Sequence, residues 1–410
     1  MDTVRTFARV VLPVASRGAI VRRPRMVNVA QRVDADALAV REVQRLRERY
    51  GPGPVQVRLP GRRLTILLEL DQVQRVLNES PEPFRLDTRE KRAALAHFQP
   101  EGVLISPPAE RSARRPFNEA VLDAERPVHR LVEPFTRVVR EETDLLLEEI
   151  ARSGVLAWDD YVTTWMRVVR RVVLGDRARD DEKTTDLLLQ LREDANWSFL
   201  KPGRDAHRRE FLVRLRSHLE RAEPGSLAEV IAATPAPSET EQQVPQWLFA
   251  FDAATWAGFR ALGLLAAQPG AVDRARDELR GLPGLPFLRA TVLESVRLWP
   301  TTPAILRDTT QDTEWEGGTL PAGASVLIFA SYFHRDETRL PEAHRFAPEL
   351  WLRERTDQDW PLVPFSGGPG ICPGRNLVLL TTSLLLAGLV GRTRYQVEGA
   401  DLGTVNGLTP

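Results

Sequence analysis

The chain has a single cysteine, Cys372, and the residues around it restrict the backbone more than any other segment does. Glycines and prolines crowd both sides of this thiol in the segment 364–376, PFSGGPGICPGRN. Such a backbone suits tight turns and close approach by a flat group. A lone thiol is otherwise a buried apolar filler. The apolar run 377–386 predicts a helix that begins beside the thiol, and N–H groups at a helix start favour the metal-binding thiolate.

Four residues of this loop carry a family resemblance. Phe365, Gly368, Cys372 and Gly374 match the haem-ligand loop of the cytochrome P-450 superfamily, which reads Phe, two residues, Gly, three residues, Cys, one residue, Gly. The resemblance implies that Cys372 is the axial thiolate of the iron of haem b, a ligand that favours O–O cleavage. It also implies that Phe365 shields the sulfur and that Gly368, Ile371 and Gly374 are cofactor-binding residues.

A second motif lies about 75 residues before the cysteine. The segment 288–298 has apolar residues at helical spacing, and Glu294 and Arg297 share one face of that helix. Alone, the pair reads as an exposed ion pair worth a few tenths of a kcal/mol. Followed by Trp299 and Pro300, it resembles the K helix of the family, whose Glu–Arg pair is buried and structural.

The segments 333–336 and 346–351 resemble the meander of the family, with one departure. Leu350 stands where the family has the third member of its Glu-Arg-Arg network. Arg345 or Arg353 is the candidate to replace that missing arginine.

Two arginines match the residues that bind the haem propionates in the family. Arg114, in a segment that resembles the start of the C helix, is one, and Arg307 is the other. A guanidinium fork pairs with a carboxylate bidentately, which suits both places. Glu110 replaces the usual aromatic or histidine partner of Arg114, and Gly370 replaces the usual basic residue two positions before the cysteine.

The segment 247–267 resembles the long I helix, which crosses the haem in the family. Asp252 and Ala253 take the positions of the acid–alcohol pair that relays protons, so the acid is present and the alcohol is absent. The alternative for Asp252 is a solvated or capped helix acid, and Thr255 would substitute for the alcohol only with a backbone shift. A substrate hydroxyl or ordered water replaces the alcohol, or peroxide is used directly, or the reaction is not hydroxylation.

By the same resemblance, a largely apolar pocket implies a lipophilic substrate. The pocket residues are Phe249, Phe251, Ala253, Thr302 and Ile305. Fatty-acid peroxygenases of the superfamily carry an Arg-Pro pair in the I helix, and Arg260 has no proline after it, which weakens the peroxide-driven alternative.

Composition sets broader limits. Lys+Arg and Asp+Glu both number 56 among 410 residues, so no global field attracts nucleic acid. One cysteine allows no intramolecular disulfide, as in a reducing compartment, and we expect a cytoplasmic location.

We find no run of about 20 apolar residues, and therefore expect no transmembrane anchor. Residues 1–30 form an arginine-rich extension, either a packed helix or a segment that lies on an anionic membrane.

The expected fold is predominantly α with a small β region. The resemblance implies the cytochrome P-450 fold, a triangular helical prism with haem between the I helix and the cysteine loop, as one domain over 1–410. A hairpin is predicted at 55–59 and 64–68 with its turn at Pro60 and Gly61, and a strand at 325–329. Helices are predicted at 129–150, 159–174 and 184–191.

The resemblance implies a haem-thiolate monooxygenase that takes electrons from a separate ferredoxin-type partner, with Arg111, Arg115 and Arg375 as a basic docking face. One alternative is a peroxide-driven or non-redox haem-thiolate enzyme. Another is a haem-binding protein without oxygenase activity. The oligomeric state stays open.

Overall fold

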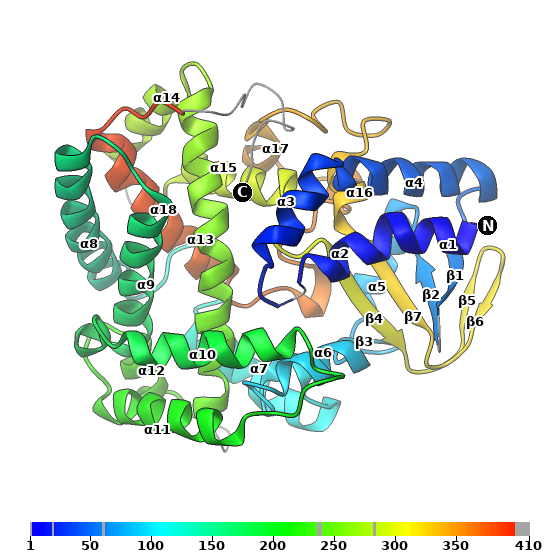
Figure 1. Cartoon of the computed structure of the whole chain (residues 1–410), viewed down its shortest axis with the longest axis horizontal. Coiled ribbons are helices and arrows are strands. Elements are labelled where there is room, and N and C mark those ends of the chain that lie inside the picture. The colour runs from blue at the N-terminus through cyan, green and yellow to red at the C-terminus, as the bar shows by residue number, and fades with distance from the viewer. Residues whose placement is uncertain (1, 19, 60–61, 236–239, 282–283, 398–410) are drawn as a thin grey trace. The chain divides into compact units, whose positions relative to one another are not determined.

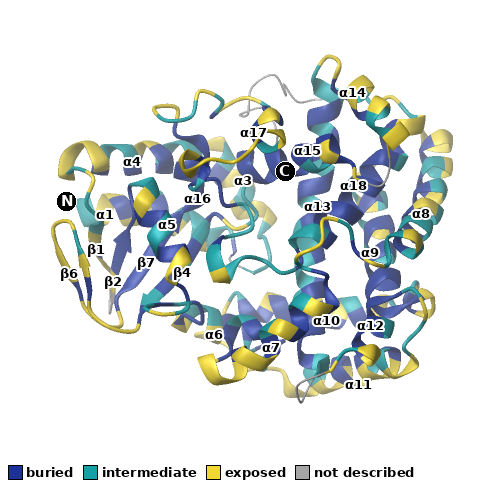
Figure 2. Ribbon diagram, turned by 180° about the vertical axis from the view of Figure 1, so that it is seen from behind, coloured by how far each residue is buried: buried dark blue, intermediate teal, exposed yellow. Residues whose placement is uncertain are grey.

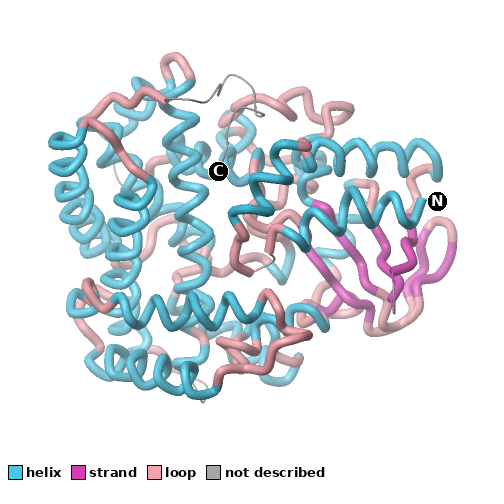
Figure 3. Tube along the Cα trace, in the orientation of Figure 1, coloured by secondary structure: helices cyan, strands magenta, loops and turns pink. Residues whose placement is uncertain are grey.

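The structure, a computed structural model, describes residues 2–18, 20–59, 62–235, 240–281 and 284–397 (Figure 1). Helices dominate these residues, and the strands form one small sheet and a hairpin (Figure 3). This confirms the predominantly α fold with a small β region. The described residues form two compact units: unit 1 from 2–92 and 296–372, and unit 2 from 93–295 and 373–397. A single integrated domain stays a prediction.

A five-stranded sheet organises unit 1. Its order is β1 (Val55–Leu59), β2 (Arg62–Ile66), β7 (Ser325–Phe329), β4 (Ala304–Thr309) and β3 (Phe84–Arg85). β2 and β7 run parallel, with Leu64 opposite Ser325, and the other pairs are antiparallel. All five residues of β7 are buried, as suits a central strand (Figure 2). A separate hairpin joins β5 (Thr313–Trp315) and β6 (Gly318–Leu320).

The predicted strands 55–59 and 325–329 are confirmed with their bounds. The predicted strand 64–68 begins and ends two residues earlier, and its turn at Pro60 and Gly61 lies outside the described residues. Side chains of α4 and α5 pack with the sheet in one apolar core. The helices of unit 1 are α1 (Asp2–Thr6), η1 (Phe7–Val11), α2 (Leu12–Ser16), α3 (Pro24–Arg32), α4 (Ala35–Tyr50), α5 (Leu70–Asn78), α16 (Ala330–Arg335), α17 (Glu349–Leu352), η6 (Asp357–Asp359) and η7 (Gly368–Gly370).

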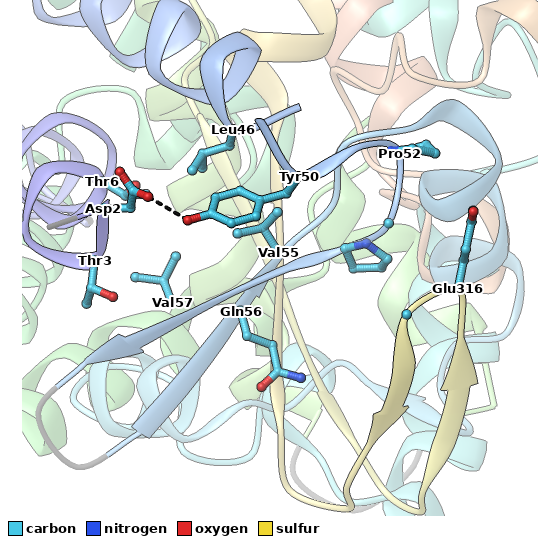
Figure 4. A pocket seen from close by; sticks show the side chains of 13 residues that line it. Asp2, Thr3, Thr6, Leu46, Tyr50, Pro52, Val55, Gln56, Val57 and Glu316 are labelled. Carbon is cyan, nitrogen blue, oxygen red and sulfur yellow. Dashed lines mark hydrogen bonds between the residues drawn. The ribbon is translucent and has the colours of Figure 1, made fainter. Parts of the chain in front are cut away.

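The arginine-rich N-terminal segment packs against α4. Arg5 donates to the buried carboxylate of Glu42 at 2.7 Å, and the Thr6 hydroxyl reaches the same group at 3.1 Å. Beside α1 lies an open pocket of about 480 Å³, in which the Tyr50 hydroxyl donates to Asp2 at 2.5 Å (Figure 4). These contacts support the alternative in which the N-terminal segment is a packed helix rather than a segment that lies on a membrane.

Unit 2 is helical. The predicted helices at 129–150, 159–174 and 184–191 form as α8, α9 and α10, with ends shifted by a few residues. Its elements are η2 (Val103–Ile105), α7 (Pro108–Val121), α8 (Val132–Ser153), α9 (Trp158–Leu174), η3 (Asp176–Ala178), α10 (Glu182–Ala195), α11 (Asp205–Arg221), α12 (Leu227–Ala233), η4 (Thr240–Gln242), α13 (Val244–Ala267), α14 (Ala271–Glu278), η5 (Leu279–Gly281) and α18 (Arg375–Arg392). Two further helices, α6 (Arg89–Leu95) and α15 (Pro286–Leu298), cross the boundary between the units along the chain.

The long helix α13 packs against α9, α14 and α18. The span 240–267 is long and apolar enough to cross a membrane by length and composition, yet 56% of its most apolar window is buried inside the chain. Core helices pass the same test, so this is weak evidence for a membrane anchor.

Candidate functional site

The cysteine loop of unit 1 is folded back on itself. The Cys372 N–H donates to the Phe365 carbonyl at 3.0 Å, and the Ile371 N–H donates to the Gly368 carbonyl at the same distance. Cys372 forms no disulfide and is partly exposed. α18 begins three residues later, at Arg375, as the sequence predicts. The loop therefore presents its thiol at the start of a helix.

Gly368 is required by the local backbone. Its φ is +58°, and a Cβ there would lie 2.1 Å from the Leu77 carbonyl oxygen at the end of α5. No L side chain fits that position without moving α5. The glycine that the sequence motif demands thus has a packing reason in this chain.

Arg307 of β4 lies beside this loop. It is buried, and its guanidinium donates to Ser80 Oγ at 3.1 Å, to Ser366 Oγ at 3.3 Å and to the Leu306 carbonyl at 2.9 Å. A Cβ at Gly370 would lie 2.9 Å from Nη2 of Arg307. The arginine therefore occupies the space beside the loop into which a side chain at position 370 would project.

In unit 2, Arg114 of α7 already holds a carboxylate. Its guanidinium donates to Glu101 at 2.5 Å and to Ser106 Oγ at 2.8 Å, and the residue is only 7% exposed. Glu110, in the place of the usual aromatic or histidine partner, is exposed. Arg111 is buried and donates to the Val103 carbonyl at 3.2 Å, so the predicted docking face loses this member.

One stripe of α13 is only partly buried. Residues at steps of three and four, among them Phe249, Ala253 and Trp256, keep intermediate exposure on a helix otherwise packed in the core. Phe251 is on another face, 2% exposed against Trp165 of α9, and its role in a substrate pocket stays a prediction. A stripe of small and aromatic side chains suits a flat apolar ligand.

Asp252 is paired with a residue that sequence reasoning missed. Arg192 of α10 donates to Oδ2 of Asp252 at 2.6 Å and lies 4.5 Å from the ring centre of Phe249. The Arg192 side chain is 5% exposed and that of Asp252 is 37% exposed. Thr255 is buried, and its hydroxyl bonds to the Phe251 carbonyl of its own helix at 3.4 Å, so it does not replace the absent alcohol.

Glu294 and Arg297 are both fully buried on α15, as the K-helix resemblance implies. The guanidinium of Arg297 donates at 2.7–3.2 Å to four backbone carbonyls in and between the two meander segments: those of His334, Glu342, Ala343 and Arg345.

The predicted replacements for the missing arginine at Leu350 point elsewhere. The side chain of Arg345 pairs with Glu342 at 2.9 Å and that of Arg353 with Asp359 at 2.5 Å. Leu350 itself is buried. Arg345 thus contributes a carbonyl to the network rather than a charge.

Thr302 precedes β4 by two residues, and Ile305 is the second residue of that strand. Thr302 is exposed, whereas Ile305 is 7% exposed and packs in the core of unit 1. Their roles in a substrate pocket stay predictions.

His334 is a buried neutral acceptor in the same network. Its Nε2 accepts the Val363 N–H at 3.1 Å. Burial, with a smaller effect from Arg297, lowers the pKa of His334 from 6.5 to about 3. The unfolded chain binds this proton below pH 6.5, and the folded chain does not until near pH 3.

We therefore expect stability to fall with acid over that window, by up to about 1.4 kcal/mol per pH unit from this residue. Urea unfolding at pH 7.5 and pH 5.5 measures the loss, and His334→Gln, an acceptor that does not titrate, should reduce it. An unchanged pH dependence in the variant would remove His334 as the cause.

Known proteins resemble this chain both in sequence and in fold. Residues 262–404 match the sequence profile of the cytochrome P-450 family. A solved structure of a zebra fish cytochrome P-450 with progesterone superimposes with a TM-score of 0.67 and 17% identity, over 88% of this chain and 94% of that one. The chain is thus similar to the cytochrome P-450 family over residues 262–404, and its fold is that of a cytochrome P-450.

Curated relatives match over a shorter stretch. The cyclooctat-9-en-7-ol 5-monooxygenase of Streptomyces melanosporofaciens is 33% identical over 153 residues, which are 34% of this chain and 33% of that protein. The geraniol 8-hydroxylase of Catharanthus roseus is 32% identical over 155 residues, 34% of this chain and 31% of that protein. The match spans about a third of each relative.

The cofactor of cytochromes P-450 is haem, and each unit presents groups that fit it. Unit 1 offers the partly exposed thiol of Cys372 and, beside its loop, the guanidinium of Arg307. Unit 2 offers Arg114, which already donates to the carboxylate of Glu101, and the partly exposed stripe of α13. A thiolate, carboxylate-binding arginines and an apolar helix face are the donor set that an iron porphyrin with propionates requires.

Proposed function

We propose that this protein is a cytochrome P-450 monooxygenase that oxidises a lipophilic small molecule with O₂ and electrons from a separate, ferredoxin-type partner in the cytoplasm. The folded cysteine loop carries the proposal, because Gly368 and the Cys372 N–H bond shape it around the thiol. Relatives named for geraniol and cyclooctat-9-en-7-ol support a lipophilic substrate.

The roles of the residues follow from their chemistry. Cys372 is the proposed iron ligand, with Phe365, Gly368, Ile371 and Gly374 shaping its loop. Bound haem would supply the activation of oxygen. Arg114 and Arg307 would hold propionates as charge-assisted pairs. For Arg114 this requires Glu101 to give way, because that carboxylate now occupies the guanidinium.

Asp252 is the proposed proton carrier. Arg192 donates to Oδ2, which leaves Oδ1, on a side chain 37% exposed, as the oxygen open to water. A carboxylate placed so can take a proton from solvent and pass it on through water, which would then stand in for the alcohol missing at Ala253. The missing alcohol also keeps a peroxide-driven enzyme as the second candidate.

Asp252→Asn should lower product formation by roughly 10²-fold and leave substrate binding nearly intact, because an amide keeps the shape but relays no proton. The measurement is product formed per electron consumed with donor and O₂, alongside product formed with peroxide alone. Arg192→Met is the matched control, since it also removes the ion pair but keeps the carboxylate. Ala253→Thr tests whether a hydroxyl restores a conventional relay.

Equal turnover and coupling in wild type and Asp252→Asn would remove Asp252 from the mechanism and favour the peroxide-driven candidate. Equal losses in Asp252→Asn and Arg192→Met would instead assign the effect to the ion pair.

A further inference from the structure

Lys91 and Arg307 converge on one backbone oxygen. Lys91, in the first turn of α6, donates from Nζ to the Leu306 carbonyl at 3.2 Å, and Arg307 donates from Nη1 to the same oxygen at 2.9 Å. Lys91 also donates to the Leu86 carbonyl at 3.0 Å. An ammonium and a guanidinium that share an acceptor lie close enough for one carboxylate to accept hydrogen bonds from both.

This pair of cations lies beside the cysteine loop. A Cβ at Gly370 would lie 2.9 Å from Nη2 of Arg307 and 2.9 Å from the Leu86 side chain. Leu86 is also the residue whose carbonyl holds Lys91. Gly370, Arg307 and Lys91 therefore form one cluster, tied together by the carbonyls of Leu86 and Leu306.

Burial and hydrogen bonds fix the position of Arg307 in this cluster. Arg307 is 2% exposed, and the hydroxyls of Ser80 and Ser366 fix its direction. Lysine is rare in this chain, with Lys91, Lys183 and Lys201 the only three. An ammonium has three donors on one atom, so it can hold backbone carbonyls and a carboxylate oxygen together.

We propose that Lys91 and Arg307 form a carboxylate site beside Gly370 that holds a haem propionate. Lys91 would supply the positive charge that the family has two residues before the cysteine. Because Gly370 has no side chain, Arg307 has room beside the loop. The inference rests on the proposed function, because it assigns the carboxylate to the cofactor.

Transfer of haem from the loaded, full-length chain to excess apomyoglobin tests the site. Lys91→Met should release haem about tenfold faster, the effect expected for one lost charge-assisted hydrogen bond. Lys91→Arg, which keeps the charge, should stay closer to wild type. Lys183→Met is the matched control, since Lys183 is half-exposed and, among the described residues, forms an ion pair with Glu210 alone, at 3.7 Å. It should release haem at the wild-type rate.

Reloading the stripped chain with haem dimethyl ester, which has no free carboxylate, separates a propionate from other causes. Wild type and Lys91→Met should then release the ester at the same rate. A tenfold difference with the ester as well would show that Lys91 only supports the fold, and no difference with either haem would remove Lys91 from the site. Each of these results would overturn the inference.

If Lys91→Met fails to fold, the same comparison is made with Lys91→Gln, with circular dichroism as the check on folding. Failure of the proposed function gives a different result: the reduced wild type under carbon monoxide would lack the thiolate spectrum.

Discussion

Cys372→Ala should abolish the strongly red-shifted Soret band that we expect the reduced wild-type protein to show under carbon monoxide. That band requires a thiolate on the iron, and Cys372 is the only cysteine in the chain. Any haem that the variant retains, held by its propionates and apolar faces, should show an unshifted band. Monooxygenase turnover should fall to background with it.

Cys372→Ser separates ligation from packing, because a hydroxyl keeps nearly the volume of the thiol. It should lose the shifted band as fully as alanine does. Phe365→Leu leaves the thiol in place and should keep the band, with at most a change in its position. A variant without the thiol that kept the shifted band would contradict the ligand assignment.

Arg297→Met should prevent most of the chain from reaching a folded, haem-loaded state. The guanidinium satisfies four carbonyls of the meander inside unit 1, and it is fully buried. Methionine fills similar volume but leaves these acceptors unpaired next to a buried Glu294. Breaking such a network costs about 3–5 kcal/mol, a large share of a typical folding free energy.

Arg345→Met is the matched control. Its side chain is 65% exposed and pairs only with Glu342 in the part of the chain that the structure describes, so it should express and load haem as wild type does. Soluble yield, haem content and the midpoint of urea unfolding measure the difference. Equal yield and stability in both variants would show that the carbonyl network is not needed for folding.

The sequence predicted the parts of the site that local spacing determines. The tight turns around Gly368 and Cys372 follow from turn chemistry, and the helix at 288–298 follows from apolar periodicity. The helix at 247–267 and Arg307 were singled out only through the family resemblance. That Arg307 lies beside the cysteine loop was not predicted, because β4 and the loop are far apart in sequence.

Contacts between distant segments could not be predicted. Arg192 on Asp252 depends on how α10 lies over α13, and nothing in the sequence around position 192 indicates it. The same holds for Glu101 on Arg114 and for the four carbonyls on Arg297, since backbone acceptors leave no signal in a sequence.

The strand order of unit 1 has a consequence for synthesis on the ribosome. β2 pairs with β7, so Thr65 meets Val326 only after the whole helical stretch between them has been made. Until then the β1–β2 hairpin has an open edge, which is a site for aggregation. Contacts so distant in sequence also slow folding. The cysteine loop follows β7 in the chain, so the thiolate that we propose as the iron ligand is synthesised only after all the strands of this sheet.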